Sequence, residues 1–452
     1  MRQELQTNTI YLIGIGGIGM SALARYFRQQ NKEVSGFDRT STPLTRLMET
    51  EGMNIHYTDD PAYVPCDVGL VIYTPAIPSN NMELEYVREI DVKVAKRAEV
   101  LGMIAEGYQT IAVAGTHGKT TISSMIAHTM HNNKKSVTAL IGGVMSNYNT
   151  NMIYHDQSEF LVAEADEYDR SFLKIHPKLA IISTLAADHL DIYGSLEEME
   201  KSFAEFAGQV DKDGLVIVHE SVIDRISISD NNFVYGYGPE ADLRIANIRI
   251  IDHKYYFELH TDSDQTDICM QVPGIHNLEN AAAAAASCLW AGMDLQQIKE
   301  GLESYRGVKR RFEYILNDQG SVFIDDYAHH PEEIAACIKT ARALYPEEKI
   351  TGIFQPHLYS RTRDFADDFA ASLSSLDEVI LLDIYPAREE PIDGIDSKLI
   401  LDKIEHDNKC IANKEDLLNI IKDKDPAVMI TLGAGDIDQL IEPIKELLTA
   451  RP

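Results

Sequence analysis

A short stretch in the second hundred residues combines a glycine turn with a lysine and two threonines. It reads Ala-Gly-Thr-His-Gly-Lys-Thr-Thr at 114–121, and its alanine ends an apolar run that starts at Ile111. A strand, a glycine turn and a helix start in this order aim backbone N–H groups at a phosphate. Lys119 can then reach terminal phosphate oxygens, and the Thr120 hydroxyl can ligate Mg²⁺. Val113 stands where the common phosphate loop has its first glycine, but the residue types still indicate ATP binding.

A second glycine turn lies near the N-terminus. The chain reads Gly-Ile-Gly-Gly-Ile-Gly at 14–19, between an apolar run at 9–13 and a helix-like run from Met20. G-x-G-x-x-G in this setting is typical of a Rossmann-type pyrophosphate site. Asp38 ends the next apolar run, where a ribose-binding acid is expected. The pyrophosphate can belong to NAD, FAD or a UDP-sugar, so a dehydrogenase is one alternative.

Acidic residues and a histidine follow the next apolar runs. Glu164, Asp166 and Glu167 come at the end of one run, and each is a candidate for a metal-binding carboxylate. His189, between two aspartates, follows the run 179–183. Since α/β sheets bind ligands at the carboxyl ends of their strands, these side chains are expected near the phosphate.

Residues 209–306 contain a β-rich part and then an alanine-rich helix. Alternating runs such as 255–259 predict antiparallel strands between 209 and 272. His276 and Asn280 lie four residues apart before the alanine run, so they share one face of a helix that starts early. A carboxamide offers a donor and an acceptor, which suits the edge of adenine.

The last third of the chain gathers histidine, arginine and tyrosine after apolar runs that are typical of strands. These residues are Tyr327, His329, His330, His357, Arg361 and Arg363, and the basic cluster 309–311 precedes them. Such side chains at strand ends fit a site that holds carboxylates and phosphates. Pro331 suits the first position of a helix.

Length and composition limit the protein class. A chain of 452 residues predicts about three domains, and the alternation of strands and helices predicts an α/β fold. The net charge of −30 argues against nucleic acid or an acidic membrane as partner. Five scattered cysteines show no metal or disulfide spacing, which favours buried reduced thiols. Without a signal-peptide pattern or an apolar stretch of about 20 residues, we expect a cytoplasmic enzyme.

Seven stretches in order make the chain similar to the Mur ligases, the family that builds the peptide of bacterial cell-wall precursors. They are GIGGIGMSALA at 14–24, AGTHGKTT at 114–121, EADEYDRSF at 164–172, ADHLDIYG at 187–194, GIHNLENAAAA at 274–284, DDYAHHPEE at 325–333 and FQPHLYSRTRDF at 354–365. The resemblance implies three domains: a Rossmann-like UDP-sugar domain (1–106), a P-loop ATPase domain (107–306) and a Rossmann-like, amino-acid-binding ligase domain (307–452).

The resemblance also implies a reaction in peptidoglycan synthesis. ATP phosphorylates the lactyl carboxylate of UDP-N-acetylmuramate, and the amino group of L-alanine attacks the acyl phosphate. Because two anions must meet, cations including Mg²⁺ have to neutralise them. The alternatives are the family branch that attaches a whole tripeptide to the same UDP-sugar, a dehydrogenase, and a non-catalytic nucleotide sensor. A monomer or homodimer is expected.

Site residues follow from the resemblance by position. For ATP they are Gly115, Thr116, His117, Gly118, Lys119, Thr120, Thr121, His276, Asn280, Arg311 and Asp326, and for the metal Thr120, Glu164 and His189. For the UDP-sugar they are Gly16, Gly17, Ile18, Gly19, Met20, Ser21, Asp38, Thr74 and Ala76. For the amino acid they are Tyr327, His329, His357 and Arg361. The catalytic set is Lys119, Glu164, His189, His329 and Arg361.

Two positions depart from patterns within the family. Phe203 stands where sister ligases often carry a carbamoylated lysine, and its presence favours the alanine-adding branch. Leu358 stands where the family often has arginine, which bears on one carboxylate or phosphate contact.

Overall fold

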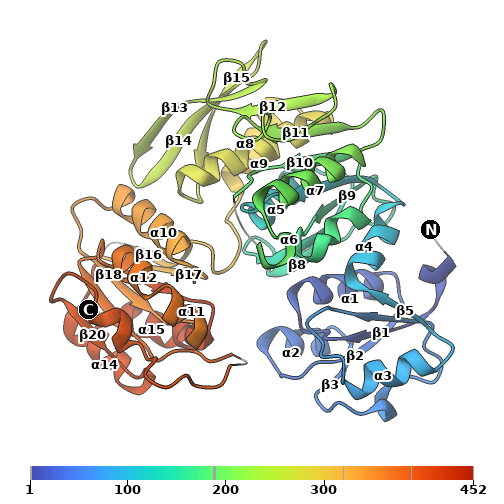
Figure 1. Cartoon of the computed structure of the whole chain (residues 1–452). Coiled ribbons are helices and arrows are strands. Elements are labelled where there is room, and N and C mark those ends of the chain that lie inside the picture. The colour runs from blue at the N-terminus through green and yellow to red at the C-terminus, as the bar shows by residue number, and fades with distance from the viewer. Residues whose placement is uncertain (1–2, 187–189, 319, 388, 451–452) are drawn as a thin grey trace. The chain divides into compact units, whose positions relative to one another are not determined.

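Three α/β sheets make up the protein in a computed structural model that describes residues 3–186, 190–318, 320–387 and 389–450 (Figure 1). The chain divides into two compact units. The first runs to Arg249 and includes Tyr256–Gln271 and His276–Arg306, and the second contains the chain from Gly307 with two short stretches. The predicted α/β class is confirmed, while the domain boundaries after residues 106 and 306 stay predictions.

The first sheet is parallel and has the strand order β3-β2-β1-β4-β5. Its strands are β1 Thr9–Ile13, β2 Glu33–Phe37, β3 Asn54–His56, β4 Leu70–Tyr73 and β5 Lys93–Lys96, and its helices are α1 Ile18–Gln29, α2 Pro43–Thr50, α3 Met82–Glu89 and α4 Arg97–Ala105. The strand β1 is buried along its whole length, as its apolar sequence predicts. Thr42 caps α2 by accepting the N–H of Thr45, and Pro43 takes the first helical position.

The second sheet has ten strands in the order β15-β14-β13-β12-β11-β10-β6-β9-β7-β8. Its strands are β6 Gln109–Ala114, β7 Val137–Met145, β8 Thr150–Ile153, β9 Phe160–Glu164, β10 Leu179–Ile182, β11 Leu215–His219, β12 Asn232–Gly236, β13 Leu243–Ile251, β14 Lys254–His260 and β15 Gln265–Met270. The main helices are α5 Lys119–Asn132, α7 Leu196–Gly208, α8 Ile275–Trp290 and α9 Leu295–Ser304.

One expectation for this sheet, antiparallel strands between 209 and 272, is wrong for the first part of that stretch. Strands β11 and β12, and the start of β13, pair in parallel rather than antiparallel. Alternating apolar residues report that one face of a strand is buried, but they carry no information about the direction of its neighbour.

The third sheet has the order β16-β17-β21-β18-β19-β20 and is parallel except for β16. Its strands are β16 Glu313–Asp318, β17 Ser321–Asp326, β18 Ile350–Phe354, β19 Glu378–Leu381, β20 Lys409–Ile411 and β21 Val428–Leu432, and its longer helices are α10 Pro331–Leu344, α12 Ala366–Leu373, α14 Lys414–Lys424 and α15 Ile441–Thr449. Helix α10 begins at Pro331, as predicted, and the Glu333 carboxylate accepts the N–H of His330, which leaves fewer unpaired donors in the first turn.

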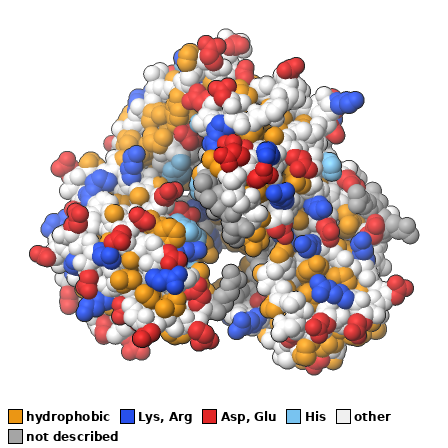
Figure 2. All heavy atoms as spheres, in the orientation of Figure 1, with side chains coloured by type: hydrophobic (Ala, Val, Ile, Leu, Met, Phe, Trp, Pro, Cys, Tyr) orange, Lys and Arg blue, Asp and Glu red, His pale blue; other side chains and the backbone are white. Residues whose placement is uncertain are grey.

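The first two sheets share one hydrophobic core. A single cluster of buried side chains includes Leu12 and Leu23 beside the first sheet and Leu140 and Leu161 of the second. A separate cluster around Phe323 fills the second unit. Lysine and arginine side chains lie scattered among acidic ones on the face drawn in Figure 2.

Two further expectations concern membranes and cysteines. Among the described residues, no helix combines the length and the apolar character that a membrane crossing requires. All five cysteines are free thiols, but Cys66 is exposed, so the expectation of burial holds only for some of them, such as Cys288 and Cys337.

Candidate active site

The 115–118 turn joins β6 to α5 through two glycines that no other residue could replace without strain. Gly115 and Gly118 have φ of +130° and +85°. A Cβ on Gly115 would lie 2.2 Å from Ser183 Oγ, and one on Gly118 would lie 2.5 Å from Asn280 Oδ1. The turn therefore leads directly into the first turn of α5, where backbone N–H groups without helical partners favour an anion.

Lys119 is held at the turn by a buried partner. Its Nζ donates to Gly115 O at 2.8 Å and to both carboxylate oxygens of Glu167 at 2.7 Å, and the Glu167 side chain is only 1% exposed. The Tyr193 hydroxyl donates to the Glu167 carbonyl at 2.6 Å. A lysine in this position carries its charge to the mouth of the turn, where a phosphate would meet it.

Glu164 ends β9 beside the hydroxyl of Thr120. Its carboxylate accepts from Thr120 Oγ1 at 3.1 Å, from Ser123 Oγ at 3.3 Å and from the Gly142 N–H at 2.6 Å. A hydroxyl and a carboxylate side by side are the oxygen ligands that Mg²⁺ prefers. Over the described residues, which leave out 187–189, no cluster of three or more His, Cys, Asp or Glu forms a complete cage.

The three acids at the end of β9 and directly after it have different partners in the structure. Glu164 faces Thr120, Glu167 pairs with Lys119, and Asp166 lies 3.4 Å from the Arg97 guanidinium. Thus Glu164 is the acid of the three that lies beside the Thr120 hydroxyl, and its metal role stays a prediction. His189, the other metal candidate, lies outside the described residues.

Helix α8 brings Asn280 to the phosphate turn. The helix starts at Ile275, so His276 and Asn280 both lie on it, four residues apart, as the sequence predicted. Asn280 is buried, its Nδ2 donates to Asn277 Oδ1 at 3.0 Å, and its Oδ1 faces Gly118. His276 lies exposed in the first turn of the same helix.

The 14–19 turn packs so closely that its glycines are needed. A Cβ on Gly16 would lie 2.8 Å from Asp38 Oδ2, which accepts the Gly16 N–H at the same distance. A Cβ on Gly19 would lie 2.8 Å from Arg97 Nη1. Asp38 therefore holds the turn through this hydrogen bond. It directly follows β2, where the sequence predicted a ribose contact.

The other residues of the predicted UDP-sugar set differ in accessibility. Met20 and Ser21 have buried side chains, and both the N–H and the hydroxyl of Ser21 are already bonded inside α1, to Gly17 O and Ile18 O. Ile18 is exposed, and Thr74 and Ala76 lie on the accessible loop after β4. Contacts to a ligand by Met20 would thus come from its backbone.

Arg97 is a candidate that sequence reasoning missed. It is the first residue of α4, lies next to Gly19, and forms an ion pair with Asp166. Its position directly after β5, at the carboxyl end of a parallel strand, was the available signal.

In the second unit, Asp326 accepts two backbone N–H groups, from Phe312 at 2.7 Å and from Ala328 at 2.8 Å. Burial raises its pKa to about 6, although these two bonds act in the opposite direction. Arg310 donates to Asp325 at 3.1 Å and its guanidinium lies 5.0 Å from the centre of the Tyr327 ring. Arg311 is exposed.

The predicted amino-acid residues meet at the ends of β17 and β18. The His329 ring lies 5.3 Å from the Tyr327 ring and 6.2 Å from the His357 ring. Burial lowers the pKa of His329, so this imidazole is mainly neutral at pH 7. The Tyr327 side chain is 45% exposed, so a ligand could reach it.

Arg361 adds a partly desolvated cation. Its Nη1 is buried and has no hydrogen-bond partner within the described part of the chain, and burial lowers the pKa of the guanidinium. A guanidinium with an unused donor suits a carboxylate or phosphate. Leu358, one turn earlier, has φ of +72°, a strained conformation that often marks functional sites.

Three family models match the chain. They are the Mur ligase family catalytic domain over residues 9–109, the Mur ligase middle domain over 113–288 and the glutamate ligase domain of Mur ligases over 310–435. The matches agree with the three sheets and confirm the three-domain architecture.

Curated relatives match over nearly their full length. A UDP-N-acetylmuramate–L-alanine ligase of Cytophaga hutchinsonii is 46% identical, with 98% of this chain and 97% of the relative covered, and one of Parabacteroides distasonis is 44% identical, with 98% of each chain covered. Among solved structures, the UDP-N-acetylmuramate–alanine ligase of Thermotoga maritima has a TM-score of 0.84 at 28% identity, with 98% of this chain and 99% of that one covered. A murein peptide ligase of Psychrobacter arcticus has a TM-score of 0.70 at 20% identity, with 98% and 99% covered, and shares the fold.

Proposed function

Since the chain belongs to the Mur ligase family, we propose that it joins L-alanine to UDP-N-acetylmuramate at the expense of ATP. The full-length likeness to relatives of that name carries the proposal. The geometry supports it, because one unit holds a Rossmann-type turn and a phosphate turn, and the other gathers Tyr327, His329 and Arg361 at strand ends. An amino acid and a carboxylate need such a set of cationic and hydrogen-bonding groups.

The proposed reaction activates a carboxylate by phosphorylation. An acyl phosphate has a leaving group that a free carboxylate lacks, and the amine then displaces phosphate to form the amide. Lys119 would neutralise the phosphate oxygens, and the backbone N–H groups of the 115–118 turn would orient them. Mg²⁺, when bound, would reduce the repulsion between the two anions. Thr120 and Glu164 are placed to hold it, because their oxygens already lie 3.1 Å apart.

The second unit would supply the amino acid. A neutral His329 can accept a proton from the ammonium group of alanine, which must be deprotonated before it attacks. Arg361 would hold a carboxylate with its unused donor. The roles of His276, Arg311 and Asp326 toward ATP, and of His357 toward the amino acid, stay predictions.

A coupled ADP-release assay tests the proposal. ADP should form only when ATP, Mg²⁺, UDP-N-acetylmuramate and L-alanine are all present. Equal turnover with the tripeptide in place of alanine would move the assignment to the recycling branch. With ¹⁸O in the sugar carboxylate, the label should appear in the released phosphate, and its absence would contradict the acyl phosphate. NADH binding in a fluorescence titration would favour a dehydrogenase instead.

A further inference from the structure

The β7–β8 hairpin of the first unit contacts a carboxylate beside the phosphate turn and the helix that follows the 14–19 turn. On β7, the Gly142 N–H donates to Glu164 Oε1 at 2.6 Å. On β8, Asn151 Nδ2 donates to Ile18 O at 2.7 Å and to Ser21 Oγ at 2.9 Å, in the first turn of α1. The hairpin therefore connects the carboxylate beside the phosphate turn to the helix start that follows the 14–19 turn.

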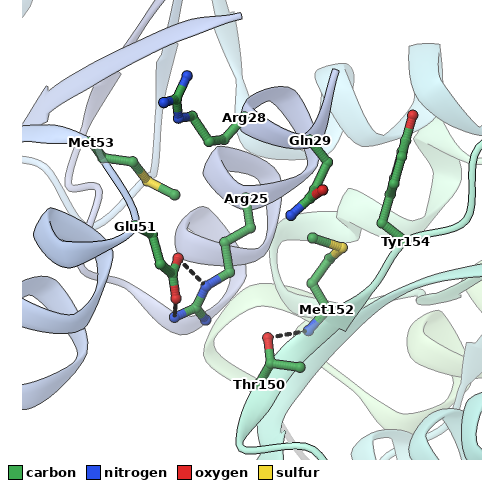
Figure 3. A pocket seen from close by; sticks show the side chains of 8 residues that line it. All are labelled: Arg25, Arg28, Gln29, Glu51, Met53, Thr150, Met152 and Tyr154. Atoms are coloured by element: carbon green, nitrogen blue, oxygen red, sulfur yellow. Dashed lines mark hydrogen bonds and ion pairs between the residues drawn. The ribbon is translucent and has the colours of Figure 1, made fainter. Parts of the chain in front are cut away.

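Every polar atom of the Asn151 side chain is used in this contact. The side chain is fully buried, and its Oδ1 accepts from Arg25 Nη1 at 2.5 Å. Arg25 also pairs with both carboxylate oxygens of Glu51 at 2.8 Å. Since an amide offers two hydrogens and an acceptor, the three bonds define its orientation. Figure 3 shows Arg25 facing Glu51, and it also draws Thr150 and Met152, the two neighbours of Asn151 on β8. These four residues are among those that line a cavity of about 360 Å³.

Strand pairs on both sides hold the part of the hairpin that contains Gly142 and Asn151. Leu140 lies opposite Met152 and Met145 lies opposite Thr150, and the register shifts between these two pairs, where Gly142 and Asn151 lie. Neighbouring strands lie about 4.8 Å apart. On its other side, β7 pairs in parallel with β9, the strand that ends at Glu164. A shift of Asn151 is thus transmitted to the strand that holds Glu164 in position.

We propose that Asn151 is a positioning residue that sets the place of the UDP-sugar turn relative to the Glu164 carboxylate. The inference rests on the proposed function, in which the sugar's carboxylate must meet a phosphate held near Glu164. An error of about 1 Å in such an approach can cost about 100-fold in rate. Neither nucleotide needs to touch Asn151 for this role.

The substitution Asn151→Asp tests the proposal, because aspartate keeps the shape and the acceptor for Arg25 but loses both donors to α1. Asn149→Asp is the matched control, since Asn149 is exposed at the turn of the same hairpin. We expect Asn151→Asp to lower kcat at least tenfold, while the Kd for UDP and the KM for ATP change less than threefold. Asn149→Asp should stay within twofold of the wild type in all three quantities.

Two results would overturn the proposal. One is an unchanged kcat in a variant with a lower thermal midpoint, which would make Asn151 purely structural. The other is a loss of UDP affinity equal to the loss of kcat, which would confine its effect to the UDP turn. If Asn151→Asp does not fold, Asn151→Ala removes the donors without adding charge and carries the same expectations.

Amide hydrogen exchange does not depend on turnover, so it tests the role of Asn151 independently of the proposed reaction. We expect UDP to slow amide hydrogen exchange over residues 137–145 in the wild type but not in Asn151→Asp. Equal protection in both proteins would contradict the link. A wild type that releases no ADP with alanine would instead contradict the assigned reaction, whatever the exchange data show.

Discussion

Replacing Glu83 by glutamine should reduce the pH dependence of unfolding of the first unit. Glu83 is fully buried at the start of α3, with Oε2 2.6 Å from the Tyr11 hydroxyl and Oε1 3.1 Å from the N–H of Asp60. The same hydroxyl lies 2.7 Å from His56 Nε2. His56 Nδ1 lies 2.9 Å from the Thr58 carbonyl, which can only accept, so Nε2 of a neutral His56 has no hydrogen. A phenol has one hydrogen and donates to only one of its two neighbours, so the other must carry an additional proton. Glu83 and His56 therefore hold one shared proton in the folded state.

The expected magnitude follows from the pKa of Glu83. Burial, with the nearby Asp59 and Asp60 carboxylates, raises it from 4.5 to about 7, although the Tyr11 hydroxyl and the Asp60 N–H lower it. Below pH 4.5 the group is protonated in both states, so it has no effect. As the pH rises toward 7, the unfolded chain ionises and the folded chain does not, and the free energy of unfolding falls. The loss is complete above pH 7 and amounts to about 3 kcal/mol.

Denaturant unfolding of the full chain at pH 5, 6, 7 and 8 measures this effect. The difference between Glu83→Gln and wild type cancels the other titrating groups. The glutamine amide has a second N–H hydrogen that the protonated carboxyl lacks and that would be buried without an acceptor, so the variant should be about 1 kcal/mol less stable at pH 5. It should become more stable than the wild type by about 2 kcal/mol at pH 8. Glu85→Gln, on the exposed side of α3, is the control. A difference that does not change with pH would refute the shared proton.

Three further predictions concern the phosphate turn. Lys119→Ala should abolish turnover while UDP-sugar binding, measured by calorimetry, survives; loss of both would contradict separate sites. Glu167→Gln should lower the Kd for ATP about fivefold, because the variant removes a carboxylate that competes with phosphate for Lys119 and saves about 1 kcal/mol; weaker ATP binding would show that the ion pair supports the site. Gly142→Ala should lower kcat at least about tenfold with the KM for the UDP-sugar unchanged, because its Cβ would lie 2.6 Å from Glu164 Oε2; unchanged kcat would mean that Glu164 can move freely.

Local chemistry made both turns predictable from the sequence. Gly115, Gly118, Gly16 and Gly19 occupy positions where strain or close approach excludes a side chain, and such glycines are visible in a sequence as motifs. The apolar strands before them were equally clear. The start of α8 and of α10 followed from helix propensity and from Pro331.

Tertiary pairing was not predictable in the same way. The sequence offered Glu164, Asp166 and Glu167 as equal candidates, and only the fold separates the acid beside Thr120 from the acid beside Lys119. Asn151 belongs to no motif, because its partners lie 130 and 133 residues away in the sequence. The parallel pairing of β11 with β12 was missed because periodicity describes faces and not directions.

The common core of the first two sheets limits how this enzyme can be recombined. Side chains near Leu12 and Leu161 belong to one interior, so the first two sheets meet along a packed seam and not only through a linker. Grafting the first hundred residues from another family member would leave mismatched volumes along that seam, even where every nucleotide motif was kept. Such chimaeras should require compensating changes on β7 and β8, and natural exchange of this domain between ligases would have faced the same barrier.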